Sequence, residues 1–106
     1  MKIEKLTDSE EIIMRAIWDS RKDPELKDVV ERVNGVYGKV WKPQTVSTFL
    51  SKLVRKNYLK MKRTGKIYTY TVLINADVYN KEQLKRLYIF LYQNNQESME
   101  QDLKEL

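Results

Sequence analysis

The side chains of this sequence that are best suited to binding chemistry are cations and short hydroxyls in the middle third of the chain. Between Glu31 and Asp77 there is no carboxylate. The formal net charge of the whole chain is only +5 at pH 7, so the excess positive charge is concentrated in this segment. A surface of one sign favours a partner of the opposite sign, here a polyanion. The basic residues of the segment are Arg32, Lys39, Lys42, Lys52, Arg55, Lys56, Lys60, Lys62, Arg63 and Lys66.

Catalytic and metal chemistry have few residues to use. The chain contains no cysteine and no histidine. This composition rules out disulfides, thiolate or imidazole metal sites, and nucleophilic catalysis by Cys or by Ser with a His base. A general base would have to be Asp or Glu, and these residues avoid the basic segment. We therefore expect a protein that is not an enzyme and that needs no cofactor.

The residues from Pro43 to Lys56 are predicted to form a helix with two unlike faces. Pro43 suits the first helical position, and Asn57 suits the left-handed cap after the last turn. Apolar residues recur at helical spacing and predict a buried stripe of Val46, Phe49, Leu50, Leu53 and Val54. The opposite face is short, polar and basic, with Gln44, Thr45, Ser47, Thr48, Ser51, Lys52 and Arg55.

This polar face has two interpretations. Short hydroxyls and an amide can approach base edges closely, which makes Gln44, Thr45, Ser47, Thr48 and Ser51 candidate base-reading residues. Lys52 and Arg55, near the C-terminal end, are candidates for phosphate contacts. An ordinary solvated helix face has a similar composition.

A basic hairpin is predicted directly after this helix. Residues 58–62 and 66–73 are rich in β-branched and aromatic types, with a turn at Arg63-Thr64-Gly65 in which Gly65 supplies a positive φ. Lys62, Arg63 and Lys66 at the tip are candidate phosphate contacts, although lysines also keep a hairpin tip soluble. A polar-faced helix followed by a basic hairpin is the layout of a winged helix, and together the two elements favour DNA binding.

The elements before this helix complete the predicted fold. A first helix begins at Leu6–Glu11 and runs to about Ser20, and a second begins with Asp23 as cap and Pro24 as first residue and closes at Asn34-Gly35. Lys39–Trp41 is predicted as a brief third strand. Trp41 is expected to pack beneath the following helix, the alternative being a phosphate contact. The expected fold class is mainly α with a small β-hairpin, a winged helix-turn-helix of order α-α-β-α-β-β followed by C-terminal helices.

The composition changes after Ile74. A fourth helix is predicted with Asn80 as cap and Gln83 in a capping box, broken at Asn94-Asn95, and a last short helix covers residues 97–106. The predicted domains are residues 1–77, a DNA-binding winged helix, and residues 78–106, a helical dimerisation segment. A wide apolar arc suggests self-association, although the helix folding back onto the first one would also bury it. The candidate dimerisation residues are Leu84, Leu87, Tyr88, Leu91, Tyr92, Met99 and Leu103.

Length and patterning set the broad class. The 106 residues suit one domain with a small appendage, and no apolar run approaches the roughly 20 residues of a membrane-spanning helix. The first residues, MKIEKLTDSEE, lack the apolar core of a signal peptide. We expect a cytoplasmic protein with no membrane partner.

With these residues described, the chain resembles the penicillinase and methicillin-resistance repressor family (BlaI/MecI/CopY type), winged-helix dimers that repress transcription. The resemblance covers about Leu6 to Asp77 and rests on EEIIMRAIW, WKPQTVSTFLSKLVRKNYL and MKRTGKIYTYTV. It implies base contacts from Gln44, Thr45, Ser47 and Thr48. It also implies backbone contacts from Lys42, Arg55 and the hairpin.

The sequence departs from this family in three places. The part after Asp77 is shorter and contains no Asn-Phe pair, the bond that a sensor protease cuts in family members, so such a protease is not expected as a partner. The cysteine cluster of copper-responsive relatives is absent. Ser47 stands where a basic residue is expected, which suggests a different operator sequence.

Two functions remain to be compared. The first is a sequence-specific transcriptional repressor that binds a pseudo-palindromic operator in double-stranded DNA as a homodimer. The second is a winged-helix adaptor that binds another protein through its hairpin and apolar C-terminal segment, without sequence-specific DNA binding. An acidic protein partner would suit the lysines equally well.

Overall fold

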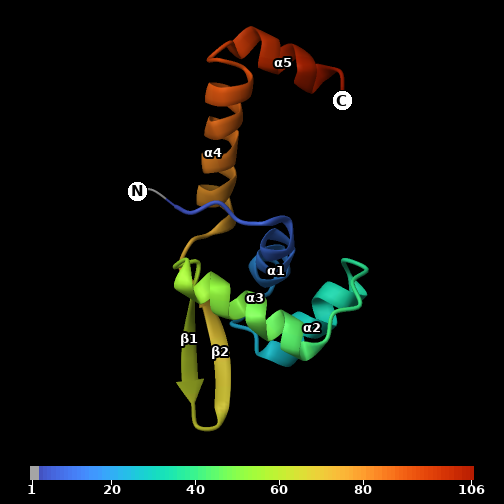
Figure 1. Ribbon diagram of the computed structural model, residues 1–106, viewed down its shortest axis with the longest axis vertical. Helices are drawn as coiled ribbons and strands as arrows, with labels where there is room; N and C mark the ends of the chain where they lie inside the picture. The colour runs from blue at the N-terminus through green and yellow to red at the C-terminus, as the bar shows by residue number, and fades with distance from the viewer. Residues whose placement is uncertain (1–2) are drawn as a thin grey trace. The chain divides into compact units, whose positions relative to one another are not determined.

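The computed structural model describes residues 3–106, which form two compact units (Figure 1). The first unit ends at Ala76, and the second is Asp77–Leu106. In chain order the first unit contains α1 (Asp8–Trp18), α2 (Leu26–Gly35), α3 (Pro43–Arg55), β1 (Leu59–Thr64) and β2 (Ile67–Val72). The second contains most of α4 (Ala76–Arg86), the π-helical turn η1 (Leu87–Leu91) and α5 (Gln96–Lys104).

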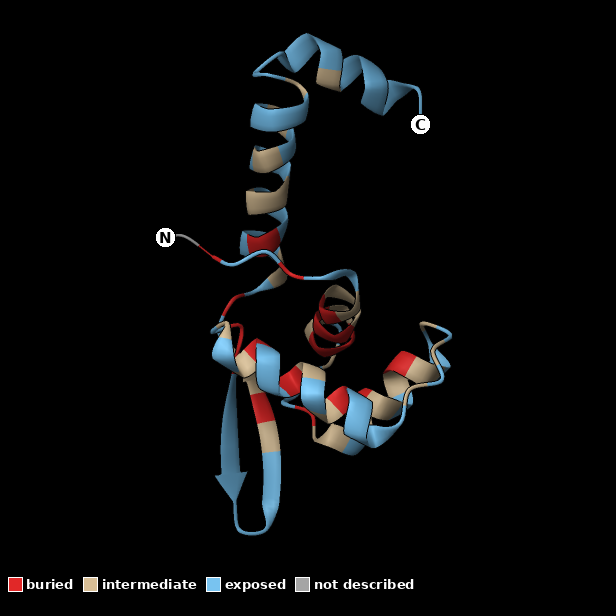
Figure 2. Cartoon of the chain, viewed as in Figure 1, coloured by how far each residue is buried: buried red, intermediate tan, exposed pale blue. Residues whose placement is uncertain are grey.

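The core of the first unit lies where α1, α2 and α3 pack against one another. All three pairs of these helices are in contact, and α3 also contacts β1. Buried positions gather on these helices, whereas the distal part of the hairpin is exposed (Figure 2). The predicted buried stripe of α3 is confirmed at Val46, Leu50 and Leu53, whereas Phe49 and Val54 are only half-buried. On α1 and α2 the residues buried against it include Ile13, Ala16, Ile17, Val29 and Val33.

The first helix begins as its sequence predicts and ends slightly earlier. Thr7 is the N-cap, its side chain accepts a hydrogen bond from the Glu10 N–H, and the Glu10 carboxylate accepts one from the Thr7 N–H, which completes a capping box. The last helical residue is Trp18, not Ser20. The Ser20 hydroxyl instead donates to the Ala16 carbonyl at 3.0 Å, a bond that closes the helix end.

The predicted start of the second helix was wrong by two residues. Glu25 is the N-cap of α2, and its N–H donates to the Asp28 carboxylate at 2.9 Å. Asp23 and Pro24 contact the hairpin instead. The Asp23 carboxylate accepts from the Thr71 hydroxyl at 2.6 Å, and the Pro24 carbonyl accepts from the Tyr70 N–H at 3.0 Å. Because these bonds hold residues 23 and 24 against β2, the helix can begin only after them.

The predicted short strand at Lys39–Trp41 does not form, and the sheet in the described residues has two strands. The Asn34 side chain takes the place of a strand partner. Its Nδ2 donates to the Trp41 carbonyl at 3.0 Å, and its Oδ1 accepts from the Trp41 N–H at 2.9 Å. Because the N–H and C=O groups of Trp41 are already hydrogen-bonded to the Asn34 side chain, they do not need to pair with a neighbouring strand.

The hairpin is antiparallel, and its turn lies further along the chain than predicted. Leu59 pairs with Val72 at the base and Thr64 with Ile67 at the tip. The two turn residues are Gly65 and Lys66, so Arg63 and Thr64 belong to β1. Gly65 has φ +65°, the left-handed backbone that a two-residue hairpin turn requires and that glycine adopts without strain.

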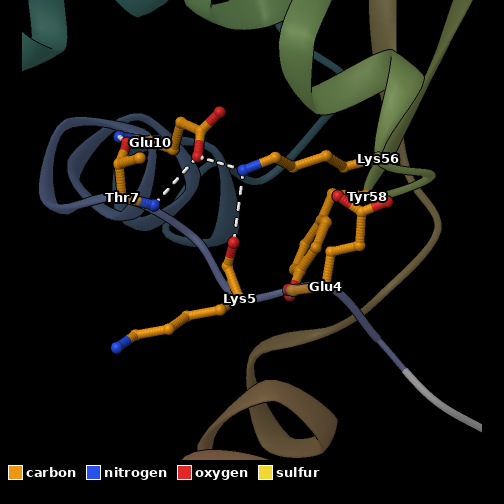
Figure 3. Close-up of polar contacts among 6 residues, drawn as sticks. All are labelled: Glu4, Lys5, Thr7, Glu10, Lys56 and Tyr58. Atoms are coloured by element: carbon orange, nitrogen blue, oxygen red, sulfur yellow. Dashed lines mark hydrogen bonds and ion pairs between the residues drawn. The ribbon is translucent and has the colours of Figure 1, made fainter.

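A partly buried ion pair joins the end of α3 to the start of α1 (Figure 3). The Lys56 Nζ lies 2.6 Å from Glu10 Oε1 and 3.2 Å from the Lys5 carbonyl oxygen. The Glu10 side chain is 2% exposed and that of Lys56 is 22% exposed. Nearby, the Tyr58 hydroxyl donates to the Glu4 carbonyl at 2.5 Å. Asn57, between Lys56 and Tyr58, has φ +65°, which confirms the predicted left-handed cap.

The environment of Glu10 has opposing effects on its pKa. Burial by itself raises the pKa of the Glu10 carboxyl, but the hydrogen bonds from Lys56 and Thr7 and the charge of Lys56 together lower it below its ordinary value of 4.5. The ionised carboxylate is therefore the form that the folded chain favours.

The start of α4 was also predicted wrongly. The helix begins at Ala76, so Asn80 lies inside it and does not cap it. Asn75 precedes the first helical residue and has the side chain preferred at an N-cap. Asp77 in the first turn suits the positive end of the helix dipole and pairs with Lys81 at 3.1 Å.

The break before the last helix is confirmed. Gln93 and Asn94 have positive φ values of 49° and 64°, which end the helical path after η1. The Asn95 side chain then caps α5 by accepting from the Ser98 N–H at 3.0 Å. The last helix ends at Lys104, two residues before the predicted end.

Replacing Glu10 with glutamine should flatten the acid side of the stability curve. A carboxyl whose folded pKa is lowered contributes stability above its unfolded pKa, and this contribution is lost as the pH falls through the folded pKa. The parent chain should therefore lose stability more steeply than Glu10→Gln as the pH falls below about 5, near the pKa of an unfolded glutamate. Lys56→Met, which leaves the carboxylate buried without its cation, should cost about 3 kcal/mol at neutral pH. Urea unfolding across this pH range measures both effects, and Asp8→Asn on the exposed side of α1 is the control. Parallel curves for Glu10→Gln and the parent would contradict this account.

Replacing Asn34 with alanine should destabilise the first unit by about 1–2 kcal/mol, because two hydrogen bonds to the Trp41 backbone are lost. This loss should appear although alanine favours helix more than asparagine does. Lys27→Ala, an exposed substitution in the same helix, should stay within about 0.5 kcal/mol of the parent. Thermal unfolding followed by circular dichroism compares them. If Asn34→Ala and Lys27→Ala melted at the same temperature, the Asn34 side chain would not stabilise the first unit through its hydrogen bonds to Trp41.

Candidate nucleic-acid interface

The outward face of α3 is exposed to solvent from its first turn to its last. Phe49 and Val54 are half-buried, and Val46, Leu50 and Leu53 are fully buried on the opposite side. Among the predicted base-reading residues Ser47 is half-buried, and the exposed ones are Gln44, Thr45, Thr48 and Ser51. Lys42, Lys52 and Arg55 are exposed as well. The structure therefore brings the predicted polar and basic side chains to one surface.

The first turn of α3 favours an anion. Lys42 is the N-cap residue, Pro43 occupies the first helical position, and no acidic side chain lies in the first turn. The first backbone N–H groups of a helix have no partner within it, and the helix dipole places partial positive charge there. Gln44 and Thr45 present their side chains beside these groups, so the start of α3 combines polar side chains with free donors.

Thr48 is oriented by its own helix. Its hydroxyl donates to the Gln44 carbonyl at 3.0 Å. The lone pairs of the hydroxyl oxygen stay available to accept a hydrogen bond, and its methyl group is available for an apolar contact. Both are features that base edges in a major groove can match.

An aromatic pair supports the N-terminal half of α3, formed by Trp41 and by Phe49 of the predicted apolar stripe. The rings of Trp41 and Phe49 lie 5.3 Å apart at 47°, so Trp41 packs against the helix as expected. Lys39 Nζ lies 5.5 Å from the Trp41 ring centre, and Lys52 Nζ lies 5.8 Å from that of Phe49. These contacts hold two ammonium groups near the exposed face.

The hairpin adds a second basic surface within the same unit. Lys62, Arg63 and Lys66 are all exposed, as predicted. The register pairs Lys60 with Thr71 and Lys62 with Thr69, so these two lysines share one face of β1. Lys60 is exposed and was not among the predicted contacts, although the two-residue period of a strand could have identified it.

The positive charge of these two surfaces is not neutralised by ion pairs within residues 3–106. In the described part of the chain the salt bridges join Lys27 to Glu25, Arg32 to Asp19, Lys56 to Glu10 and Lys81 to Asp77. Among these described ion pairs, none includes a cation of the outer face of α3 or of the hairpin. Lys56 belongs to the basic segment by sequence, but its ion pair with Glu10 removes it from the candidate interface.

The second unit presents apolar side chains to solvent. Leu84, Leu87, Leu91 and Leu103 are between 43% and 71% exposed, and Tyr88, Tyr92 and Met99 are half-buried. A groove of about 430 Å³ lies between α4 and α5, lined by Lys81, Leu84, Lys85, Tyr88, Gln96, Met99, Glu100 and Leu103. Four of the seven predicted dimerisation residues therefore meet at this groove. Leu87, Leu91 and Tyr92 lie outside its lining.

The described residues contain neither a cluster of metal-ligating side chains nor a membrane-spanning helix. No group of three or more His, Cys, Asp or Glu side chains in residues 3–106 is placed to hold a metal ion. Within the same range no helix has the length and apolar character to cross a membrane.

This chain is similar in sequence and in structure to known repressor proteins. The penicillinase repressor of Bacillus licheniformis is 27% identical over 78 residues, which are 74% of this chain and 59% of that protein. The match thus spans less than two thirds of the relative. Two solved structures are also similar and cover 74% of this chain at 27% identity. One is the B. licheniformis BlaI monomer in complex with the blaP half-operator (TM-score 0.60), and the other is the DNA-binding domain of the repressor BlaI (TM-score 0.62).

The two solved structures establish the winged-helix fold of the first unit, with α3 and the β1–β2 hairpin as its characteristic elements. The sequence profile of the penicillinase repressor family, a family of transcriptional regulators, matches residues 6–105. This match extends across both units. The chain belongs to the penicillinase repressor family.

Proposed function

We propose that this chain is a transcriptional repressor that binds a pseudo-palindromic operator in double-stranded DNA as a homodimer. The observation that carries the proposal is the pair of unneutralised surfaces in one unit, the outer face of α3 and the basic hairpin. A relative in the same family forms a complex with a half-operator, and its structure matches 74% of this chain. A repressor of this kind would act in the cytoplasm.

In this proposal α3 lies in the major groove and the hairpin follows the adjacent backbone. Base edges are contacted by Gln44, Thr45, Ser47, Thr48 and Ser51. Phosphates are contacted by Lys42, Lys52, Arg55, Lys62, Arg63 and Lys66. Contacts of the first kind give sequence preference, whereas those of the second kind give affinity without it.

The second unit is proposed to join two copies. Its exposed apolar side chains need a partner, and a second copy of residues 78–106 supplies a complementary surface through two-fold symmetry. Two linked winged helices then bind two half-sites, so that two modest interfaces act together. Residues 78–106 contain no Asn-Phe pair, so cleavage at such a bond is not part of the proposal.

Two substitutions should separate base reading from phosphate binding. Selection from random duplexes should first enrich a motif with two-fold symmetry. Thr48→Ala should then weaken binding to this motif by roughly tenfold and leave binding to random DNA unchanged, as expected for a lost base contact. Lys62→Ala should weaken binding to every duplex and lower the slope of log affinity against log salt by about 1.

Fluorescence anisotropy at several salt concentrations measures both effects. Glu11→Gln on α1, away from both surfaces, is the matched control. If the selection enriched no motif, the adaptor hypothesis would replace the repressor. If Thr48→Ala and Lys62→Ala had the same profile, the division of roles between helix and hairpin would be wrong.

Leu91→Glu should convert the dimer to monomer, because it places a charge on an apolar side chain that is 71% exposed in the single chain. Gln101→Glu, an exposed polar position of α5, should leave the dimer intact. Light scattering of the full chain across a concentration series gives the oligomeric state. A parent chain that stayed monomeric throughout would contradict the dimer.

A further inference from the structure

The groove of the second unit is built by matching faces of two helices, which meet at a corner (Figure 1). Residues at positions i, i+3, i+4 and i+7 share one face of a helix, and both helices line the groove with this spacing. Each helix therefore gives the groove two apolar side chains and two polar ones. The lining residues are Lys81, Leu84, Lys85 and Tyr88 from α4 and the start of η1, and Gln96, Met99, Glu100 and Leu103 from α5.

Two tyrosines hold the corner between these helices. The Tyr88 hydroxyl donates to the Asn94 carbonyl at 2.8 Å, and the Tyr92 hydroxyl donates to the Asp102 carboxylate at 2.9 Å. These bonds tie η1 to the turn and the turn to α5, so the groove is formed within a single chain before any ligand arrives. Because the hydroxyl of Tyr88 is already bonded, its ring is the part of this side chain that an apolar ligand can contact.

The charges of the groove are divided between its two sides. Both cations come from α4, and the one carboxylate, Glu100, comes from α5 and accepts from Gln96 Nε2 at 2.9 Å. Lys81 pairs with Asp77 at 3.1 Å, but both side chains are exposed and such a pair is weak. Among the salt bridges of residues 3–106 none includes Lys85. The α4 side of the groove therefore presents an ammonium group that an anion can use.

The size and lining of the groove suit one class of ligand. Its volume of about 430 Å³ lies within the range of small-molecule sites, which are mostly apolar with a few polar groups at one side. An aromatic ring can pack against the ring of Tyr88 and the thioether of Met99. The ammonium group of Lys85 can form a charge-assisted hydrogen bond with a carboxylate or sulfonate. An aromatic molecule with one acidic group combines these features.

Charge also disfavours a second copy of the chain in this groove. A two-fold interface places the same surface of both copies face to face. If the groove lay on the two-fold axis, Lys81 and Lys85 of one copy would approach the same lysines of the other, and like charges repel. The turn η1 offers an apolar surface without this repulsion, because its exposed residues Leu87, Ile89, Phe90 and Leu91 lie outside the groove lining.

From this arrangement we propose that the groove between α4 and α5 binds a small aromatic organic acid. Lys85 binds the acidic group, and the ring lies among Leu84, Tyr88, Met99 and Leu103. The inference goes beyond the proposed repressor function and does not depend on DNA binding. It assigns these four apolar residues to the ligand and leaves the surface of η1 to the proposed dimer.

The test uses the full chain and two fluorescent probes that share one aromatic frame. Anilinonaphthalene sulfonate carries an acidic group, and phenylnaphthylamine lacks it. Fluorescence titration of the parent chain should give one saturable site per chain for each probe. The sulfonate should bind roughly fivefold more tightly at low salt, the size expected for one exposed charge pair. This difference should shrink as the salt concentration rises, because salt screens the interaction.

Four variants give the test its controls. Lys85→Gln should remove the preference for the sulfonate and leave phenylnaphthylamine binding unchanged, whereas Lys104→Gln, an exposed lysine of α5 outside the lining, should keep the preference. Met99→Trp fills the groove and should weaken binding of both probes at least roughly tenfold. Leu91→Glu lies outside the lining and should keep both sites. The melting curve of Lys85→Gln should match that of the parent, since its side chain is exposed.

The remaining outcomes overturn the inference. A parent chain that binds neither probe at a saturable site removes the ligand site. If Leu91→Glu abolishes probe binding and Met99→Trp does not, the probes lie on the surface of η1. If Lys85→Gln and Lys104→Gln weaken sulfonate binding equally, Lys85 does not recognise the acidic group. If light scattering shows that Met99→Trp converts a dimer to monomer, a second copy occupies the groove. Operator binding is measured separately, so failure of the repressor proposal leaves these results unchanged.

Discussion

The partly buried ion pair between Glu10 and Lys56 is the contact on which the binding unit depends. It joins the first turn of α1 to the residue that ends α3, and the Tyr58 hydroxyl adds a bond to the Glu4 carbonyl beside it. Lys56, Asn57 and Tyr58 also form the link between α3 and β1. Because the angle between the helix and the hairpin is set at this link, holding it against α1 fixes both proposed DNA-contacting elements together. An ion pair with one nearly buried member suits this task, since breaking it leaves a charge without its partner.

In the first unit, several acidic side chains accept hydrogen bonds that hold the fold together, and basic side chains predominate on the proposed interface. Acidic side chains are used for caps and for fastening loops, as in Glu10 for α1, Asp28 for α2 and Asp23 for the base of the hairpin. The outer face of α3 and the hairpin tip carry cations and neutral side chains and no carboxylate. Such a surface repels itself slightly in the free protein, and a polyanion relieves this repulsion. The fold thus keeps its carboxylates close to the backbone groups that need them and away from the proposed interface.

The second unit buries fewer of its apolar side chains than the first unit does. Its helices are short, and within it the apolar side chains of α4, η1 and α5 are largely half-buried or exposed. Between α4 and α5 the chain forms a π-helical turn at Leu87–Leu91, in which the Tyr92 N–H donates to the Leu87 carbonyl five residues back. A segment that leaves so much apolar surface in contact with water needs a partner to be stable, and the proposed homodimer provides one.

The sequence by itself determined the buried residues Val46, Leu50 and Leu53 of α3, the polar face of that helix, the positive φ of Asn57 and Gly65, and the winged-helix fold class. These features follow from local spacing and from residue types with strong backbone preferences. Only the tertiary structure decided that Asp23 and Pro24 bond to β2 rather than start α2, that Asn34 replaces a strand partner for Trp41, and that Lys56 pairs with Glu10. Each of these depends on residues far apart in the chain or on competition for one backbone group, which no local pattern encodes. The contact between the Arg63 guanidinium and the Tyr68 ring, 5.6 Å from the ring centre, belongs to the same class, because it requires the register that places Tyr68 opposite Arg63.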